Sequence, residues 1–244
     1  MCRMVGAVFR QSFPIYSLND LRAVSERGKL PGEEEPGHRD GWGIVSFKNG
    51  SPLYVGRSDR PAFLAPSFCS ALEGVRGLDV PNIVIAHARA ASEGGPKLAN
   101  THPFIVGRLV FGHNGTIYDF YPKTSLRPKG DTDSERLAVL VAERFDKEGE
   151  LGSALKSVIK EALVGAEFSA VIILASDGKS LYGYRDYAKE ERAYYYDLRL
   201  AKSDSYAAFY QQSFVGYEGE VSQVRKGELV SVNLGLEVRR ESLL

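Results

Sequence analysis

The chain of 244 residues has 43% hydrophobic, 25% charged and 11% aromatic side chains, the proportions of an ordinary globular protein. A chain of this length buries a large core without disulfides or a structural metal, and we expect a single domain over residues 2–244. Its 31 basic and 31 acidic residues balance, which argues against a surface that binds nucleic acid or a membrane.

The sequence carries no signal for a membrane or for export. The sequence contains no run of eighteen apolar residues that would predict a spanning helix, and it contains no basic-then-apolar segment that would predict a secretory signal. The two cysteines, Cys2 and Cys69, belong to no C-x-x-C pair, which fits a reducing compartment. We therefore expect a cytoplasmic protein. Cys69 lies in the apolar, helix-like segment 65–75, where a buried and inert thiol is expected.

The first half of the chain predicts mainly strands. An apolar strand at 3–10 begins almost at the terminus, and the helical spacing of Leu18, Leu21 and Val24 ends at Gly28. A polar loop follows at 31–38, and its three glutamates are interpreted as solvated. Further strands are predicted at 41–48, 52–56, 82–87 and 104–112.

Two neighbouring helices come next. Thr132, with Glu135 three residues later, matches a capping box, and an apolar stripe follows from Leu137; a second helix is predicted at 153–164. The remaining strands are predicted at 168–175, 181–185, 193–200, 206–211, 228–233 and 236–240. Helices that cluster between runs of strands favour an α+β fold with separate helix layers over a doubly wound parallel sheet.

The position of Cys2 is the most informative feature of the sequence. The small side chain at position 2 permits an aminopeptidase to remove Met1, which leaves a thiol and a free α-amine on one residue. The reference pKa is roughly 7.7–8.0 for the amine and roughly 8.5 for the thiol, so the amine can take the thiol proton near neutrality. This pair can cleave amides. The alternative is that Cys2 is a small apolar residue at the start of a strand.

Two strand ends carry further candidate groups. Arg89 follows the apolar run 83–86 and can hold a carboxylate by two parallel hydrogen bonds, although a structural ion pair explains it almost as well. Asn114 and Gly115 end the next apolar strand, where Asn-Gly is usually a turn. Alternatively, the Asn114 amide and the Gly115 N–H form an oxyanion hole, in which one donor stabilises the transition state by roughly 3–4 kcal/mol.

The acidic segment 131–135 and the histidines also admit two interpretations each. Asp133 is either an acid at a helix start, where the dipole favours it, or a group that binds an ammonium. The histidines could bind zinc, but no close His pair or accompanying Cys pair has the usual ligand spacing, and we expect no metal. The four histidines all lie in or beside these motifs: His38, His87, His102 and His113.

Five motifs follow one another along the chain, in the order Cys2, His87-x-Arg89, Asn100-Thr-His102-Pro103, His113-Asn-Gly115 and Thr132-Asp133-Ser-Glu135. In this order they resemble the class II glutamine amidotransferases, which are N-terminal nucleophile (Ntn) hydrolases. The resemblance spans residues 2 to about 145, and the segments 38–43 and 100–104 look closest to the stand-alone branch that lacks an attached synthase domain. It implies a four-layer αββα sandwich of two antiparallel sheets.

The resemblance also implies catalytic roles. Cys2 is the nucleophile with its own amine as base, and Asn114 and Gly115 form the oxyanion hole. Ala90 replaces a bulkier residue of certain synthases, which leaves the pocket shape open.

Substrate recognition follows from the same resemblance. Arg89 binds the α-carboxylate of glutamine, Asp133 binds its α-ammonium, and Ser92 and His102 line the pocket. Ser92 stands where some relatives have Thr, and the serine keeps the hydroxyl group.

The implied reaction converts glutamine to glutamate and ammonia through a γ-glutamyl thioester on Cys2, without a cofactor. A separate synthase partner is expected to accept the ammonia, because the residues after 150 predict only the remainder of the same sandwich. One alternative is hydrolysis of a γ-glutamyl peptide or other amide by the same thiolate. Another is a non-catalytic domain that binds a partner or a small amino acid.

Overall fold

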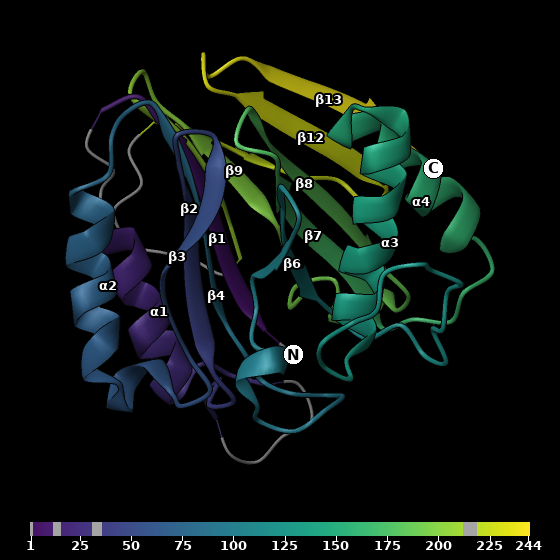
Figure 1. Ribbon diagram of the computed structural model, residues 1–244, viewed down its shortest axis with the longest axis horizontal. Helices are drawn as coiled ribbons and strands as arrows, with labels where there is room; N and C mark the ends of the chain where they lie inside the picture. Colours follow the sequence, from purple (N-terminus) through teal and green to yellow (C-terminus); the bar gives the residue numbers. More distant parts are fainter. Residues whose placement is uncertain (1, 12–15, 31–35, 212–218) are drawn as a thin grey trace.

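The computed structural model describes residues 2–11, 16–30, 36–211 and 219–244. Two antiparallel sheets pack face to face, and a pair of helices covers the outer face of each (Figure 1). Helices α1 (Tyr16–Arg27) and α2 (Pro66–Arg76) lie on one side, and α3 (Asp133–Glu148) and α4 (Leu151–Ala162) lie on the other. The four-layer α+β sandwich expected from the resemblance is therefore confirmed.

The first sheet has β1 at its centre, because β1 pairs with β10 on one side and with β4 on the other. Its strand order is β11-β9-β10-β1-β4-β2-β3. The bounds are β1 (Arg3–Phe9), β2 (Trp42–Lys48), β3 (Ser51–Ser58), β4 (Asn82–Ala88), β9 (Arg199–Lys202), β10 (Tyr206–Tyr210) and β11 (Glu220–Gln223).

The second sheet has the strand order β13-β12-β8-β7-β6-β5. Its bounds are β5 (Phe104–Val106), β6 (Leu109–Asn114), β7 (Ala170–Ser176), β8 (Ser180–Tyr187), β12 (Glu228–Asn233) and β13 (Val238–Ser242). Short 3₁₀ turns lie at Ala62–Leu64, Leu98–Asn100 and Glu190–Arg192.

Alternating side chains of β1 serve two cores. Val5 and Phe9 pack toward α1 and α2, whereas Met4 and Val8 pack between the sheets against residues of β7 and β12. A third core lies between the second sheet and α3 and α4. The period of two places Cys2 on the same side as Met4, so its side chain faces the second sheet.

Most predicted elements are confirmed, but four expectations were wrong. The segment 104–112 is a hairpin, since Gly107 takes a positive φ of 58° and separates β5 from β6. Residues 193–198 form a turn before β9, and the prediction had no strand for 220–223. Cys69 is exposed rather than buried. The predicted loop at 31–38 lies partly outside the described residues.

The capping box is only half formed. Thr132 Oγ1 accepts the Glu135 N–H at 3.1 Å, as predicted. The Glu135 carboxylate instead accepts the N–H groups of Lys129 and Gly130, at 2.9 and 2.6 Å, and so fixes the loop that leads into α3.

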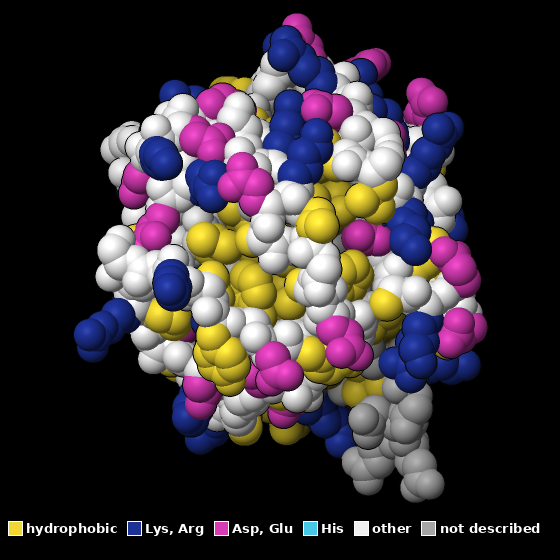
Figure 2. Space-filling view, turned by 90° about the vertical axis from the view of Figure 1, so that its right-hand side faces the viewer, with side chains coloured by type: hydrophobic (Ala, Val, Ile, Leu, Met, Phe, Trp, Pro, Cys, Tyr) yellow, Lys and Arg dark blue, Asp and Glu magenta, His cyan; other side chains and the backbone are white. Residues whose placement is uncertain are grey.

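The face covered by α3 and α4 carries hydrophobic side chains inside a rim of charged ones (Figure 2). Val164 and Leu244 are strongly exposed. Among the described residues, no helix is long and apolar enough to span a membrane.

Candidate active site

Cys2 lies directly before β1 with 7% of its surface exposed. Its nitrogen donates a hydrogen bond to Asn114 Oδ1 at 2.7 Å, although 112 residues separate the two in sequence. Its sulfur lies 3.7 Å from the carbonyl oxygen of Ala90, the residue after Arg89. Two of the predicted motifs therefore meet at Cys2, from β4 of the same sheet and from β6 of the facing sheet.

Both ends of the Asn114 side-chain amide are engaged. Oδ1 accepts from the Cys2 nitrogen, and Nδ2 donates to Gln211 Oε1 at 3.1 Å. Because an amide nitrogen carries two hydrogens, one N–H of Asn114 remains for an oxyanion. Gln211 comes directly after β10, is fully buried, and its N–H donates to the Met4 carbonyl.

Gly115 lies where only glycine fits. Its φ is +136°, and an added Cβ would lie 1.8 Å from the Ala170 carbonyl oxygen. Glycine alone tolerates this backbone conformation and this close approach to β7. The Asn-Gly pair is therefore fixed between strands of one sheet rather than placed in a free turn.

Arg89 is buried, with 2% of its surface exposed, and its guanidinium faces the loop that follows it. It donates to the carbonyl oxygens of Glu93, Gly94 and Gly95 at 2.8, 3.0 and 3.1 Å. Arg89 forms no ion pair with any described residue, so the structural ion pair considered from the sequence is not found. The guanidinium instead binds backbone oxygens, which are the kind of acceptor that a carboxylate can replace.

Ser92 and Asp133 lie on either side of the segment after β6. Ser92 Oγ pairs with Thr116 Oγ1 at 2.7 Å, and Asp133 Oδ2 accepts the Ile117 N–H at 2.8 Å. Burial raises the pKa of the Asp133 carboxyl, while the Ile117 N–H opposes that shift. The Asp133 N–H donates to Glu93 Oε2 at 2.8 Å, so the loop after Arg89 is attached to the first turn of α3.

His102 is packed between rings. It stacks on His87 with centroids 4.2 Å apart and contacts Phe104 at 4.3 Å, and neither ring nitrogen has a hydrogen-bond partner among the described residues. Burial lowers the pKa of His102 well below its ordinary value.

Two other histidines support the strand end that carries Asn114. His87 Nε2 lies 3.2 Å from the His113 carbonyl, and His113 Nδ1 lies 2.8 Å from Ser134 Oγ. Burial lowers the pKa of His87 to about 3 and that of His113 to about 4. No group of three or more His, Cys, Asp or Glu side chains in the described part of the chain is arranged to hold a metal ion.

Sequence reasoning missed three groups that hold the site. Arg3 donates to the Cys2 carbonyl at 3.0 Å and lies over the Tyr195 ring at 3.7 Å. Gln211 orients Asn114, and Glu93 attaches the loop to α3. Arg3 could have been noticed as a charged residue beside Cys2 in an apolar strand, whereas nothing local marks Gln211 or Glu93.

A family model for class-II glutamine amidotransferases matches residues 1–232. The chain belongs to the class-II glutamine amidotransferases. The common reaction of this family is hydrolysis of the glutamine side-chain amide. Cys2, Asn114 and Ala90 meet at the ends of three separate strands.

Other class-II amidotransferases and uncharacterised proteins align with most of the chain. It is 27% identical to protein MJ1515 of Methanocaldococcus jannaschii, covering 96% of this chain and 64% of that protein. It is 30% identical to YafJ of Escherichia coli, named as a glutamine amidotransferase, over 75% of this chain and 72% of that protein. A glutamine–fructose-6-phosphate aminotransferase of Xylella fastidiosa is 29% identical over 73% of this chain, which spans only 28% of that enzyme.

Solved structures of amidotransferases share the fold. A class-II domain protein of Silicibacter pomeroyi superposes with a TM-score of 0.61 at 15% identity, covering 99% of both chains. The glutamine phosphoribosylpyrophosphate amidotransferase of Bacillus subtilis superposes with a TM-score of 0.60 at 15% identity, covering all of this chain and 49% of that chain. The sandwich is thus the Ntn amidotransferase fold.

Proposed function

We propose that this amidotransferase hydrolyses glutamine through a γ-glutamyl thioester on Cys2. The observation that carries the proposal is the position of Cys2, whose nitrogen bonds to Asn114 Oδ1 at 2.7 Å and whose sulfur lies beside Ala90. Cys2 thus contacts both Asn114 and the residue that follows Arg89. A catalytically silent fold has no need of this convergence.

Removal of Met1 turns the Cys2 nitrogen into an α-amine, which takes the thiol proton. The thiolate attacks the amide carbon, and the developing oxyanion receives hydrogen bonds from Asn114 Nδ2 and the Gly115 N–H. The carbon–nitrogen bond then breaks, and the α-ammonium returns its proton to the leaving ammonia. Water, deprotonated by the same amine, cleaves the thioester to glutamate and frees the thiol.

The substrate's amino acid group binds across the loop after Arg89. The α-carboxylate takes the place of loop carbonyl oxygens on the Arg89 guanidinium, where two parallel N–H donors match its geometry. The α-ammonium binds Asp133 and favours the ionised carboxylate against the effect of burial. Ser92 and His102 complete the pocket.

Residues 2–244 act as one amidotransferase domain that delivers ammonia to a separate acceptor or synthase. A cytoplasmic location suits the chemistry because a reducing compartment keeps the Cys2 thiol free.

Ammonia release from glutamine tests the proposal, with intact mass recorded on the same sample to show that Met1 is absent. Cys2→Ala is expected to abolish release while the circular dichroism spectrum stays unchanged. Arg89→Lys is expected to raise KM at least tenfold with a smaller effect on kcat, because a single ammonium cannot make two parallel bonds to the carboxylate. Ammonia release by Cys2→Ala at the wild-type rate would overturn the proposal.

A further inference from the structure

A pocket of about 570 Å³ opens at the end of the second sheet, next to the candidate active site. This volume lies within the range of small-molecule sites, roughly 300–1,000 Å³. Its walls combine aromatic, hydroxyl and charged side chains, namely Tyr118, Glu167, Phe168, Ser169, Lys189 and Arg192. None of the roles assigned to the glutamine site uses these residues.

The strand order places this pocket at the same end of the sandwich as Cys2. In the first sheet Arg89 follows β4, and its neighbour β1 carries Cys2. In the facing sheet Asn114 ends β6, and the pocket residues lie at the ends of β7 and β8, which come next in order. An amide that is attacked at Cys2 can therefore place its amine half toward the ends of β7 and β8.

Thr116 joins the two sites. Its hydroxyl pairs with Ser92 Oγ at 2.7 Å, and its N–H donates to Ser169 Oγ at 3.0 Å. Arg192 lies on the wall of the pocket that the segment after β8 forms. Its carbonyl accepts the N–H of Tyr195, whose ring lies beneath Arg3.

The charges of the pocket favour an anion. Lys189 and Arg192 outnumber Glu167, and Lys189 makes no ion pair with any described residue. The Arg192 side chain forms a hydrogen bond with the buried Tyr196 phenol. Burial raises the pKa of Tyr196, and the hydrogen bonds with Ser169 and Arg192 lower it. Tyr118 and Phe168 add aromatic surface of the kind that packs against an apolar or aromatic group.

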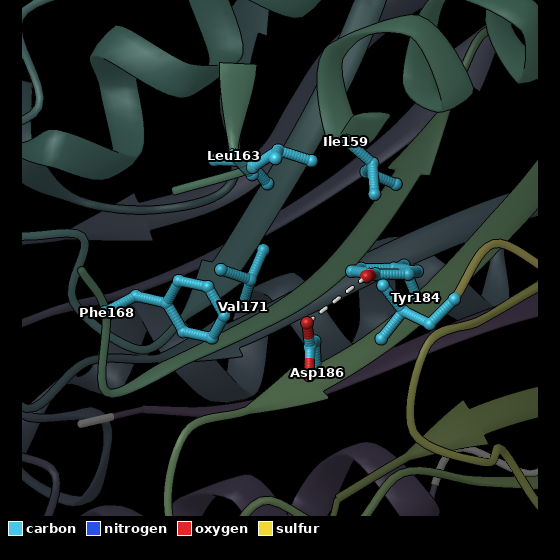
Figure 3. A pocket seen from close by; sticks show the side chains of 8 residues that line it. Ile159, Leu163, Phe168, Val171, Tyr184 and Asp186 are labelled. Atoms are coloured by element: carbon cyan, nitrogen blue, oxygen red, sulfur yellow. Dashed lines mark hydrogen bonds between the residues drawn. The ribbon is translucent and has the colours of Figure 1, made fainter. Parts of the chain in front are cut away.

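A second pocket, which shares Phe168 with the first, is too small to receive part of a substrate (Figure 3). Its volume is only about 80 Å³, and its other walls include Val171, Tyr184 and Asp186. The Asp186 carboxylate already accepts from the Tyr184 hydroxyl at 3.5 Å and the Tyr187 N–H at 2.8 Å. The larger pocket is therefore the one that can receive part of a substrate.

We propose that the larger pocket binds the amine half of γ-glutamyl amides, specifically an amino acid with an aromatic side chain and a free carboxylate. The proposal rests on the proposed function, because it uses the same thiolate. Lys189 and Arg192 bind the carboxylate, and Tyr118 and Phe168 contact the side chain. The chain is thereby a γ-glutamyl-peptide hydrolase as well as a glutaminase.

The reaction keeps the same balance of atoms as glutamine hydrolysis. The Cys2 thiolate forms a bond to the γ-carbonyl carbon, and the bond from that carbon to the amino acid nitrogen breaks. The nitrogen takes one proton from the Cys2 α-ammonium and leaves as the free amine. Water then hydrolyses the thioester to glutamate.

Three substrates and two variants test the proposal. γ-Glutamyl-phenylalanine and γ-glutamyl-phenethylamine differ only in the carboxylate, and glutamine reports on the catalytic machinery. Lys189→Gln removes one pocket cation, and Lys179→Gln removes an exposed lysine from the turn at the opposite end of the β7–β8 hairpin. For each enzyme with each substrate, kcat/KM is measured from the release of glutamate.

We expect the wild type to cleave γ-glutamyl-phenylalanine at least tenfold more efficiently than γ-glutamyl-phenethylamine. Lys189→Gln lowers kcat/KM for γ-glutamyl-phenylalanine at least fivefold and keeps kcat/KM for the other two substrates within twofold of the wild type. Lys179→Gln keeps kcat/KM for all three substrates within twofold of the wild type. Equal cleavage of the two amides, or an equal effect of Lys189→Gln on both, overturns the pocket assignment. Turnover of glutamine without turnover of γ-glutamyl-phenylalanine overturns the pocket alone, whereas failure on all three substrates overturns the proposed function with it.

Discussion

The nitrogen of Cys2 and the side-chain oxygen of Asn114 are 2.7 Å apart, across the interface between the two sheets. This bond connects the proposed nucleophile to the proposed oxyanion donor, so that both keep one geometry. Under the proposed mechanism, removal of Met1 leaves the α-amine with this acceptor, which orients its lone pair relative to the thiol. The predictions below follow from this bond and from the groups that hold it.

Replacement of Asn114 by alanine removes an oxyanion donor and the acceptor of the Cys2 nitrogen. We expect kcat for glutamine hydrolysis to fall by about 10²–10³ with a small change in KM, because the lost interaction is made in the transition state. Steady-state kinetics measure the effect. Asn233→Ala, at the end of β12, is the matched control and should leave kcat unchanged.

Gln211 is expected to act through Asn114 as a positioning residue. Gln211→Leu removes the acceptor of Asn114 Nδ2, and we expect kcat to fall roughly tenfold with KM within twofold. Gln211→Glu should recover most of the rate. Its buried carboxyl stays protonated, accepts from Asn114 and donates to the Asp197 carbonyl. Equal losses in the two variants would indicate a role in folding alone.

Gly115→Ala is expected to be severely destabilising. The new Cβ would lie 1.8 Å from the Ala170 carbonyl oxygen, so β6 and β7 must separate. Gly165→Ala has a comparable positive φ, +78°, but open space around the added Cβ, and should cost only about 1–2 kcal/mol. Chemical denaturation separates the two effects. A Gly115→Ala protein as stable as Gly165→Ala would show that the close approach to Ala170 is wrong.

Stability is expected to fall as the pH drops below 6.5. Burial lowers the pKa of His113 to about 4 and that of His87 to about 3, so the unfolded chain binds protons that the folded chain excludes. Each histidine should lower the free energy of unfolding by about 2 kcal/mol between pH 7 and pH 5. Urea denaturation at the two pH values measures the difference, which His113→Gln should reduce by that amount.

The sequence predicted the parts of this structure that depend on local pattern. Short apolar runs located β1 and β4, and the spacing around Thr132 located the start of α3. The hairpin at Gly107 was missed because the apolar pattern continues through it. The exposure of Cys69 depends on which side of α2 meets the first sheet, and the apolar composition of that segment alone does not determine this.

Candidate site residues could be named from motifs, but their contacts could not. The bond from Cys2 to Asn114 and the approach of the sulfur to Ala90 depend on how the two sheets are stacked. Gln211 and Glu93 carry no local signal, because their roles arise from partners 97 and 40 residues away in the chain. The pocket around Lys189 is likewise assembled from three separate segments.

The central claim is that the thiol of Cys2 forms a covalent bond to the γ-carbon of the substrate. A glutamine analogue with an electrophilic diazoketone in place of the amide labels such a nucleophile, and peptide mass spectrometry locates the label. We predict one label, on an N-terminal peptide that begins at Cys2, and the same label in Cys69→Ser but none in Cys2→Ala. Labelling of Cys69 alone, or ammonia release from glutamine by a protein whose Cys2 is never labelled, would contradict the account.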